Sequence, residues 1–547
     1  MEHMLQQLKG GFSGELTSAP SKRAAIKHDG SLFEILPDAV AIPTSSADVQ
    51  ALVSFISAHK PLYPTLSITP RGAGTDMSGA ALGSSFILDT TKLNTIHAFN
   101  GRLLRAQPGV KLYDMHRMLA AHSLTLGSSP SSRDIATLGG MVANNAAGEQ
   151  SYAYGATKEW VRALKVVLAD GNEYTVRPLN RAELTRKMAE NTYEGRLYAH
   201  LYSLVNRNYD IIRNAKPHTV RTASGYNLWD VWDKETGIFN LIPLFTGSQG
   251  TLGIITDITI EAVKKPALTA SVAVYLPSLA QLATVLATTK KYQPLSIEGF
   301  DDVSFMQALR GHTLLRKQIG KREYVKQQAR LLPSAVTFRP HASDFMLLVE
   351  LSGDTKEELT NVVSSLINEL ETARFTVDIV AHEGDPLPLR RTRTATAALL
   401  QDQVKSKHAV SFLDDMAVHP SKSAAFLADL KKILKKYKFP ATIHGHFGDG
   451  VFHVIPLVNV YTPKYAAKLE PLLRTLSAAV LRYNGSLSGE HGDGMLRGPW
   501  LPAQFNQEVY QLFKEVKELF DPLYIFNPHK KTDASWEYSM SHLRTRR

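Results

Sequence analysis

The C-terminal half of the sequence concentrates residues that can bind a metal ion and move a proton. Two histidines, His446 and His453, lie on either side of the dipeptide Asp449-Gly450, which favours a two-residue type I′ hairpin turn. Counting outward from that turn places His446 directly opposite His453, with His444 on the same face, and directly opposed residues have Cβ atoms about 4.5–5.5 Å apart. The spacing therefore predicts two imidazoles that can chelate one metal ion.

A second segment, Ser488–Gly494, places an acidic residue beside a histidine, with glycines on both sides. Glu490 is the expected third ligand beside His446 and His453, and such a set leaves open positions on zinc, manganese or iron for a substrate oxygen. We expect zinc or manganese. Adjacent side chains of an extended chain point to opposite sides, so His491 is expected to stay free as a general base unless the glycines bend the chain. The alternative for the histidine pair is a hydrogen-bonded pair without metal.

The elements that must position these residues alternate between strand and helix. Helical spacing begins after Ser45 or Ser46 as a cap, and short apolar runs then predict strands. The segments are a helix at Ala47–His59, strands at Leu66–Pro70, Ser85–Asp89, Val161–Leu168 and within Ile238–Ala262, and alternating strand and helix at Ser271–Val274, Phe345–Leu351 and Leu359–Thr372. The sequence predicts an α+β protein with a lead-in at 1–35, a first domain at 36–265 with a helical insertion at 180–230, a second domain at 266–528 and a basic tail at 529–547.

The composition narrows the possible functions. The chain has 547 residues, 44% hydrophobic and 21% charged, which excludes a disordered or collagenous chain and predicts two or three domains. It has no cysteine, so disulfides and cysteine-ligated iron–sulfur clusters are excluded within this chain. The net charge of +11 is dispersed and no nucleic-acid-binding motif is recognised, so no nucleic-acid partner is expected. Without a transmembrane-length run or a secretory signal we expect a cytoplasmic protein, with peripheral association at the inner face of a membrane as the alternative.

Three glycine-rich clusters stand out in the first half, at residues 70–79, 137–148 and 246–255. Consecutive small residues let backbone N–H groups point into one concavity that can hold phosphate oxygens. The first cluster is not a Rossmann fingerprint, because turn and strand patterns follow it instead of a helix. Any one of the clusters alone is explained by ordinary turn or bulge chemistry.

Together, in this order and spacing, the clusters resemble the flavin-binding loops of the vanillyl-alcohol-oxidase superfamily, which read PRGxGT..SG, TLGGM.ANN..G....YG and GS.GTLGI. The resemblance implies a two-part FAD-binding domain of that type followed by an α+β substrate domain. Thr75 and Asp76 take the loop positions where covalent relatives carry histidine, and cysteine is absent, so FAD would be non-covalent. Gln249 stands where the family usually has Glu. The implied FAD-binding residues are Arg71, Gly72, Ala73, Gly74, Thr75 and Ser78 at the pyrophosphate, Pro130, Ser131, Thr137, Gly139, Gly140, Asn144 and Gly148 along the adenosine and isoalloxazine channel, Ile254 and Ile255 beside the flavin, and Asn527.

The histidine and acidic segments resemble the GHxGDGNxH and GEHG signatures of the D-2-hydroxyacid dehydrogenase branch of that superfamily, which includes D-lactate and D-2-hydroxyglutarate dehydrogenases and the glycolate oxidase flavin subunit. The chain departs from this pattern at Val451, in place of Asn, and at His529, in place of Gly. In the family, an Arg three residues after a Trp pairs with the substrate carboxylate. Here Arg393 takes the Arg place and Arg390 the Trp place, and a solvated basic turn is the alternative for this segment.

The resemblance implies FAD-dependent oxidation of a small D-2-hydroxy acid, of the D-lactate or D-2-hydroxyglutarate type, to the 2-oxo acid. Arg393 would bind the substrate carboxylate and the metal its hydroxyl, while His491 would accept the hydroxyl proton as hydride passes to the flavin. A quinone or a separate iron–sulfur or other electron-transfer protein would reoxidise the flavin. The alternatives are a flavin oxidase of the same fold that acts on another alcohol with oxygen, and a non-catalytic flavin-binding subunit of an oxidoreductase complex.

Overall fold

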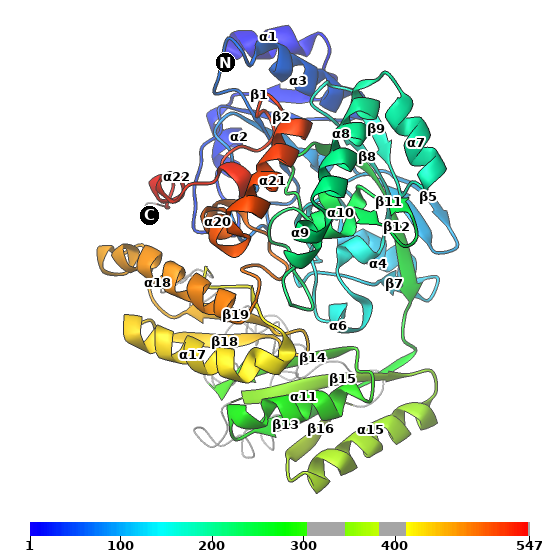
Figure 1. Ribbon diagram of the computed structural model, residues 1–547, viewed down its shortest axis with the longest axis vertical. Helices are drawn as coiled ribbons and strands as arrows, with labels where there is room; N and C mark the ends of the chain where they lie inside the picture. The colour runs from blue at the N-terminus through cyan, green and yellow to red at the C-terminus, as the bar shows by residue number, and fades with distance from the viewer. Residues whose placement is uncertain (303–344, 382–411, 545–547) are drawn as a thin grey trace.

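The computed structural model describes residues 1–302, 345–381 and 412–544, which form two parts stacked along the long axis (Figure 1). Both chain ends lie beside the upper part in that view. Strand β12 (Ile254–Lys264) leads from the upper part into β13 (Leu268–Leu276) of the lower part. None of the described helices combines the length and the apolar character needed to cross a lipid bilayer.

A small sheet in the upper part carries the first glycine-rich loop at the end of a strand. Helix α3 (Ser46–His59) precedes that strand, and Ser45, one of the two predicted caps, forms a capping box with Asp48. The lead-in at 1–35 contributes helices α1 (Glu2–Lys9) and α2 (Pro20–Ala25) and an antiparallel edge strand. The sheet order is β1 (Glu15–Thr17), β2 (Ala39–Ile42), β4 (Phe86–Asp89) and β3 (Ile68–Arg71), with the last three parallel.

A second, antiparallel sheet forms the other half of the upper part, with β12 at its centre. The predicted strand within Ile238–Ala262 is interrupted, because Pro243 lies in the first turn of α10 (Ile242–Phe245) and the third glycine-rich loop follows it. The predicted helical insertion contains α7 (Arg181–Ala189), α8 (Tyr193–Arg207) and α9 (Tyr209–Asn214). The other elements here are β5 (Ile96–Asn100), β6 (Leu103–Ala106), α4 (Leu112–Ala120), β7 (Leu124–Leu126), α5 (Leu138–Asn144), α6 (Ser151–Tyr154), β8 (Val161–Val167), β9 (Glu173–Val176), β10 (Trp232–Asp233) and β11 (Ile238–Phe239).

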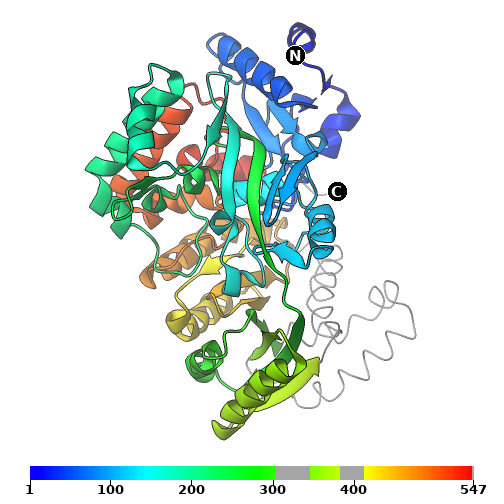
Figure 2. The same ribbon diagram turned by 90° about the vertical axis from the view of Figure 1, so that its right-hand side faces the viewer.

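The lower part is built on a seven-stranded antiparallel sheet that presents the histidines on one face. Ile443 and Val454 join the hydrophobic core between the sheet and its covering helices. Because side chains alternate along a strand, His444 and His453 lie on the opposite face. The sheet order is β16 (Thr376–Ala381), β13, β15 (Phe345–Gly353), β14 (Ser296–Asp301), β18 (Ala441–His446), β19 (Val451–Pro456) and β17 (Met416–Ala417), covered by α11 (Leu282–Lys290), α15 (Lys356–Thr372), α17 (Ser423–Tyr437) and α18 (Pro463–Arg482), as Figures 1 and 2 show.

The chain returns to the upper part after the lower sheet is complete. Helix α21 (Asn506–Phe520) packs against α8 and contributes Phe513 and Val516 to the core of the second sheet. Phe526 then enters the core of the first sheet. Residues 266–528, predicted as one domain, therefore contribute to three hydrophobic cores. The remaining helices of this return are α19 (Gly494–Arg497), α20 (Leu501–Gln504) and α22 (Trp536–Ser541).

Candidate active site

The hairpin of β18 and β19 has a different register from the predicted one. His444 lies opposite His453 and His446 lies opposite Val451, so the prediction of a two-residue turn with His446 opposite His453 is wrong. The loop is longer because Phe447 is buried in the core and Asp449 forms an ion pair with a buried arginine. The register moved by two residues on one strand, which keeps each side chain on its face. His446 and His453 are therefore still neighbours, with ring centroids 5.3 Å apart.

The structure brings together the three residues predicted as metal ligands. Nε2 of His446 lies 3.1 Å, and Nε2 of His453 3.4 Å, from Oε1 of Glu490. One ligand atom from each residue lies within 4.8 Å of the other two, and all three side chains are buried. We call these three residues the ligand cluster.

Each member of the ligand cluster is held by a charged group that the sequence interpretation missed. Glu298 on β14 faces Nδ1 of His446 at 2.7 Å, and Asp414 faces Nδ1 of His453 at 2.5 Å. Buried Arg221 donates to Oε2 of Glu490 at 2.9 Å and also pairs with Asp449. The only sequence signal for these three residues is an acidic pair, Asp414-Asp415, within an apolar run.

The charges of the cluster shift its pKa values strongly. Burial lowers the pKa of His453, but Asp414 and Glu490 outweigh this effect and raise it to about 10. Burial raises the pKa of Glu490, but His446, His453 and Arg221 outweigh it and hold the pKa well below its usual value. The metal-free cluster therefore retains a proton on His453, and a metal ion that binds there must displace it.

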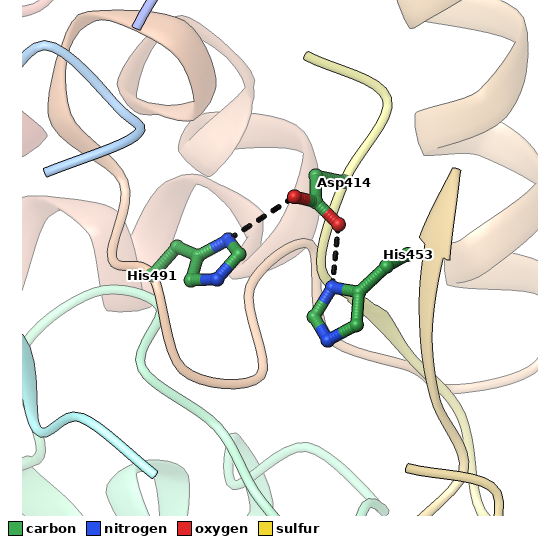
Figure 3. A group of neighbouring side chains, drawn as sticks. All are labelled: Asp414, His453 and His491. Atoms are coloured by element: carbon green, nitrogen blue, oxygen red, sulfur yellow. Dashed lines mark hydrogen bonds and ion pairs between the residues drawn. The ribbon is translucent and has the colours of Figure 1, made fainter. Parts of the chain in front are cut away.

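His491 lies at the side of the ligand cluster and reaches the cofactor cavity. Its ring stacks on that of His453, with centroids 5.3 Å apart and an interplanar angle of 24°. Its Nε2 lies 3.8 Å from Oε1 of Glu490, and its Nδ1 lies 3.7 Å from a carboxylate oxygen of Asp414 (Figure 3). Glu490 and His491 thus do not point to opposite sides, because residues 489–491 form a bend and not an extended strand.

One cavity joins the three glycine-rich loops to the ligand cluster. Its empty space is about 1260 Å³, part of it open to solvent. Glu490 and His491 form part of its wall. The predicted cofactor residues that line it are Arg71, Gly72, Ala73, Gly74, Thr75, Pro130, Ser131, Thr137, Gly139, Gly140, Asn144, Ile254 and Ile255.

Three predicted cofactor residues lie behind the wall of this cavity instead of lining it. The hydroxyl of Ser78 donates to Asp76. A Cβ on Gly148 would lie 1.9 Å from the carbonyl oxygen of Ser129, so glycine is required there by the protein itself. Asn527 donates to the backbone oxygens of Ala80 and Gln249, at 2.9 and 2.7 Å, and accepts from Thr69.

Gln249 connects the glycine-rich loops to the segment that carries Glu490. Its amide nitrogen donates to Ser78 and Asn144, and its oxygen accepts from the backbone N–H of Gly494 at 2.9 Å. The departure from Glu at this position therefore supplies an N–H donor to the loops. Arg393 and Arg390 lie outside the described residues.

Two family models match the chain. A model described as FAD binding domain matches residues 37–177, and one described as FAD linked oxidases, C-terminal domain, matches residues 265–531. The chain belongs to the FAD-linked oxidases of the vanillyl-alcohol-oxidase superfamily. Its fold is also that of p-cresol methylhydroxylase in a substrate-bound crystal structure, with a TM-score of 0.68, 15% identity, and coverage of 97% of this chain and 96% of that one.

Curated relatives of this FAD-linked oxidase are named for 2-hydroxy acids. The D-2-hydroxyglutarate dehydrogenase of Pseudomonas putida is 28% identical over 95% of this chain and 50% of the relative. The D-lactate dehydrogenase of Anaerostipes hadrus is 24% identical, with 90% and 89% covered, and the glycolate oxidase subunit GlcD of Bacillus subtilis is 23% identical, with 91% and 89% covered. The chain spans about half the length of the D-2-hydroxyglutarate dehydrogenase from Pseudomonas putida.

Proposed function

We propose that this FAD-linked oxidase converts a small D-2-hydroxy acid to the 2-oxo acid and passes the electrons to a separate acceptor, a quinone or an electron-transfer protein. One observation carries the proposal: Glu490 and His491 form part of the wall of the cavity that the glycine-rich loops line. A substrate bound at the ligand cluster would therefore lie beside the cofactor. The names of the relatives support the same substrate class.

The cavity fits FAD in the chemistry of its wall. The hydroxyl of Thr137 is buried and has no hydrogen-bond partner among the described residues, although it belongs to the cavity lining. A buried hydroxyl without a partner costs free energy, which a ligand in the cavity would offset. No cysteine is present in the chain, and we propose that FAD is held non-covalently. Acid precipitation should then release all the flavin into the supernatant, whereas yellow protein in the pellet would contradict this proposal.

The ligand cluster fits a divalent metal by the chemistry of its donors. Two imidazole nitrogens and a carboxylate oxygen suit zinc or manganese and leave positions open for a substrate. In His446 and His453 the second ring nitrogen faces a carboxylate, which is the usual arrangement around metal-bound histidine. Bound FAD would supply the two-electron acceptor, and the metal would polarise the substrate hydroxyl.

The chain's own residues then have distinct tasks. His446, His453 and Glu490 would hold the metal. Arg221 keeps Oε2 of Glu490 occupied, so that Oε1 is the oxygen that faces the imidazoles. His491 accepts the hydroxyl proton at the junction of the cluster and the cavity. Arg393 is proposed to bind the substrate carboxylate.

Anaerobic bleaching of the flavin tests the function. The FAD- and zinc-loaded protein is mixed with the D and L forms of lactate and 2-hydroxyglutarate, with glycolate, and with longer D-2-hydroxy acids. At least one D form should bleach the flavin, and its L form should react far more slowly. If no D-2-hydroxy acid reduces the flavin, the proposal is wrong. Reoxidation rates with oxygen and with a soluble quinone then separate a dehydrogenase from an oxidase.

A further inference from the structure

We propose that Asp414 is a positioning residue that orients a metal ligand and the general base at once, by placing one carboxylate oxygen against each imidazole. This inference rests on the proposed function, since it takes His453 as a ligand and His491 as the base. It follows from the position of one carboxylate, which faces the Nδ1 atoms of two stacked rings (Figure 3).

The two contacts come from different oxygens of the same carboxylate. Oδ1 lies 2.5 Å from Nδ1 of His453, and Oδ2 lies 3.7 Å from Nδ1 of His491. With Nδ1 directed to Asp414, the opposite nitrogen of each ring is directed to Glu490, and the two Nε2 atoms lie 3.4 and 3.8 Å from its Oε1. Asp414 thus binds His453 by a hydrogen bond and faces, at 3.7 Å, the buried Nδ1 of His491, which has no hydrogen-bond partner among the described residues.

Asp414, His453 and His491 could be taken for a second metal site, but their spacing argues against one. Ligands bound to zinc at about 2.0–2.2 Å in a tetrahedral arrangement lie more than about 3 Å apart. The distance of 2.5 Å between Asp414 and His453 is shorter. The two residues form a hydrogen bond between a carboxylate and an imidazole, as expected for a carboxylate that orients a metal-bound histidine.

Asp414 is itself fixed to the segment that carries Glu490 and His491. Buried Arg497 donates to the backbone oxygen of Asp414 at 2.7 Å and to that of Gly492 at 2.9 Å. The neighbouring Asp415 accepts the backbone N–H groups of Glu490 and His491, at 2.9 and 2.8 Å. Asp415 therefore holds the backbone of this segment, and Asp414 faces the imidazole of His491 that projects from it.

Glu298 provides a matched control. It makes the corresponding contact with the other metal-binding imidazole, at 2.7 Å from Nδ1 of His446. It is buried to the same extent as Asp414, with 3% and 5% of each residue exposed. Among the imidazoles of the ligand cluster and the base, a change of Glu298 should disturb that of His446. A change of Asp414 should instead disturb those of His453 and His491.

The experiment compares Asp414→Asn with Glu298→Gln, each loaded with FAD. Zinc affinity is measured by competition with a chromogenic chelator, and both variants should lose affinity by about 10–100-fold. Flavin reduction is then followed by stopped flow at saturating zinc, with the limiting rate and the substrate dissociation constant determined separately. Zinc should restore most of the limiting rate in Glu298→Gln. Asp414→Asn should remain slower than the wild type by about 10–100-fold, with little change in substrate affinity, because general-base catalysis is worth about 10²–10⁴ in rate.

The outcomes are distinct. If saturating zinc restores Asp414→Asn as fully as Glu298→Gln, Asp414 acts on His453 alone and the proposal is overturned. If no D-2-hydroxy acid reduces the wild-type flavin, the proposed function fails. Crystal structures of both variants then test separately whether Asp414 orients His491. The ring of His491 should lose its single orientation in Asp414→Asn and keep it in Glu298→Gln. Should Asp414→Asn fail to retain FAD, Asp414→Glu is measured in its place. It keeps the charge but lengthens the side chain, so it should recover zinc affinity more than the limiting rate.

Discussion

The site has two walls that are built in opposite ways: the cofactor wall, formed by the glycine-rich loops, and the charged wall, formed by the ligand cluster and the charged residues that hold it. Three short glycine-rich stretches, each continuous in the sequence, line the cofactor cavity, and backbone N–H groups of such stretches can point into one concavity. The ligand cluster instead needs buried charges from distant segments, since Arg221, Glu298 and Asp414 each hold one of its members. The comparison teaches that the cofactor cavity depends on backbone shape, whereas the ligand cluster depends on charge pairs between distant segments. A substitution that disrupts the ligand cluster should therefore leave FAD binding intact.

Glu490→Ala should show the difference between the two walls most strongly. It removes the oxygen that faces both imidazoles, so zinc should be lost. Flavin reduction should fall by at least about 10³-fold, because metal polarisation is worth several kcal/mol. FAD should remain bound, and zinc content, bound flavin and stopped-flow reduction measure the three quantities. The exposed Glu357→Ala on α15 is the control, and a variant of Glu490 that keeps zinc or loses FAD would remove the distinction between the walls.

His491→Ala tests the residue at the junction of the two walls. Flavin reduction should fall by about 10²–10⁴, the usual contribution of a general base, while zinc stays stoichiometric. His444→Ala is the matched control, because both rings lie 5.3 Å from that of His453 but His444 is not among the described residues that line the cavity. Loss of zinc from His491→Ala would place His491 in the metal's coordination shell instead.

Arg221→Met tests whether the charged wall also stabilises the fold. The substitution leaves the carboxylates of Asp449 and Glu490 buried without their partner. Removing one side of a buried ion pair costs about 3–5 kcal/mol, so the temperature of thermal unfolding should drop by several degrees. Adding Asp449→Asn should recover part of the loss, since one unpaired charge is removed. An unchanged unfolding temperature would show that water reaches these carboxylates.

His116→Gln examines the cofactor wall, where the expected effect is smallest. His116 contacts Ser129, which precedes the cavity residues Pro130 and Ser131. Burial and the nearby Arg133 lower the pKa of His116 from 6.5 to about 4. The neutral ring therefore contributes stability that is fully present above pH 6.5 and is lost as the pH falls toward 4.

We expect this loss to reach about 2 kcal/mol at pH 5. Thermal unfolding of FAD-loaded protein at pH 7.5 and 5 measures it, and His116→Gln should show a smaller difference between the two pH values than the wild type. The partly exposed His97→Gln is the control. An identical pH dependence in wild type and His116→Gln would contradict the assignment.

The sequence predicted the cofactor wall better than the charged wall for a physical reason. A glycine-rich loop takes its shape from residues close in sequence, so most of the predicted lining residues lie at one cavity. The ligands His446, His453 and Glu490 also come together, even though the hairpin register was wrong, because a shift of two residues preserves the face of a strand.

The residues that hold the cluster could not be found in this way. Glu298 lies 148 residues before the histidine that it contacts, and Arg221 lies 269 residues before Glu490. Sequence separations of this size match no helix or strand period, so they do not indicate that the residues are in contact. Lone charged residues in a strand or loop are usually solvated, and only the packing of the sheet against the upper part shows that these are buried.

The position of Asn527 has a consequence for how the protein is made. This residue binds the backbone of Ala80 and Gln249 and the side chain of Thr69, 458 residues earlier in the chain. A ribosome therefore releases the glycine-rich loops long before the side chain that ties them together leaves the exit tunnel. Domains usually fold in order as they are synthesised, but here the residue that ties these loops together follows the whole lower sheet in the chain. Flavin loading should thus follow the synthesis of both the upper and the lower part.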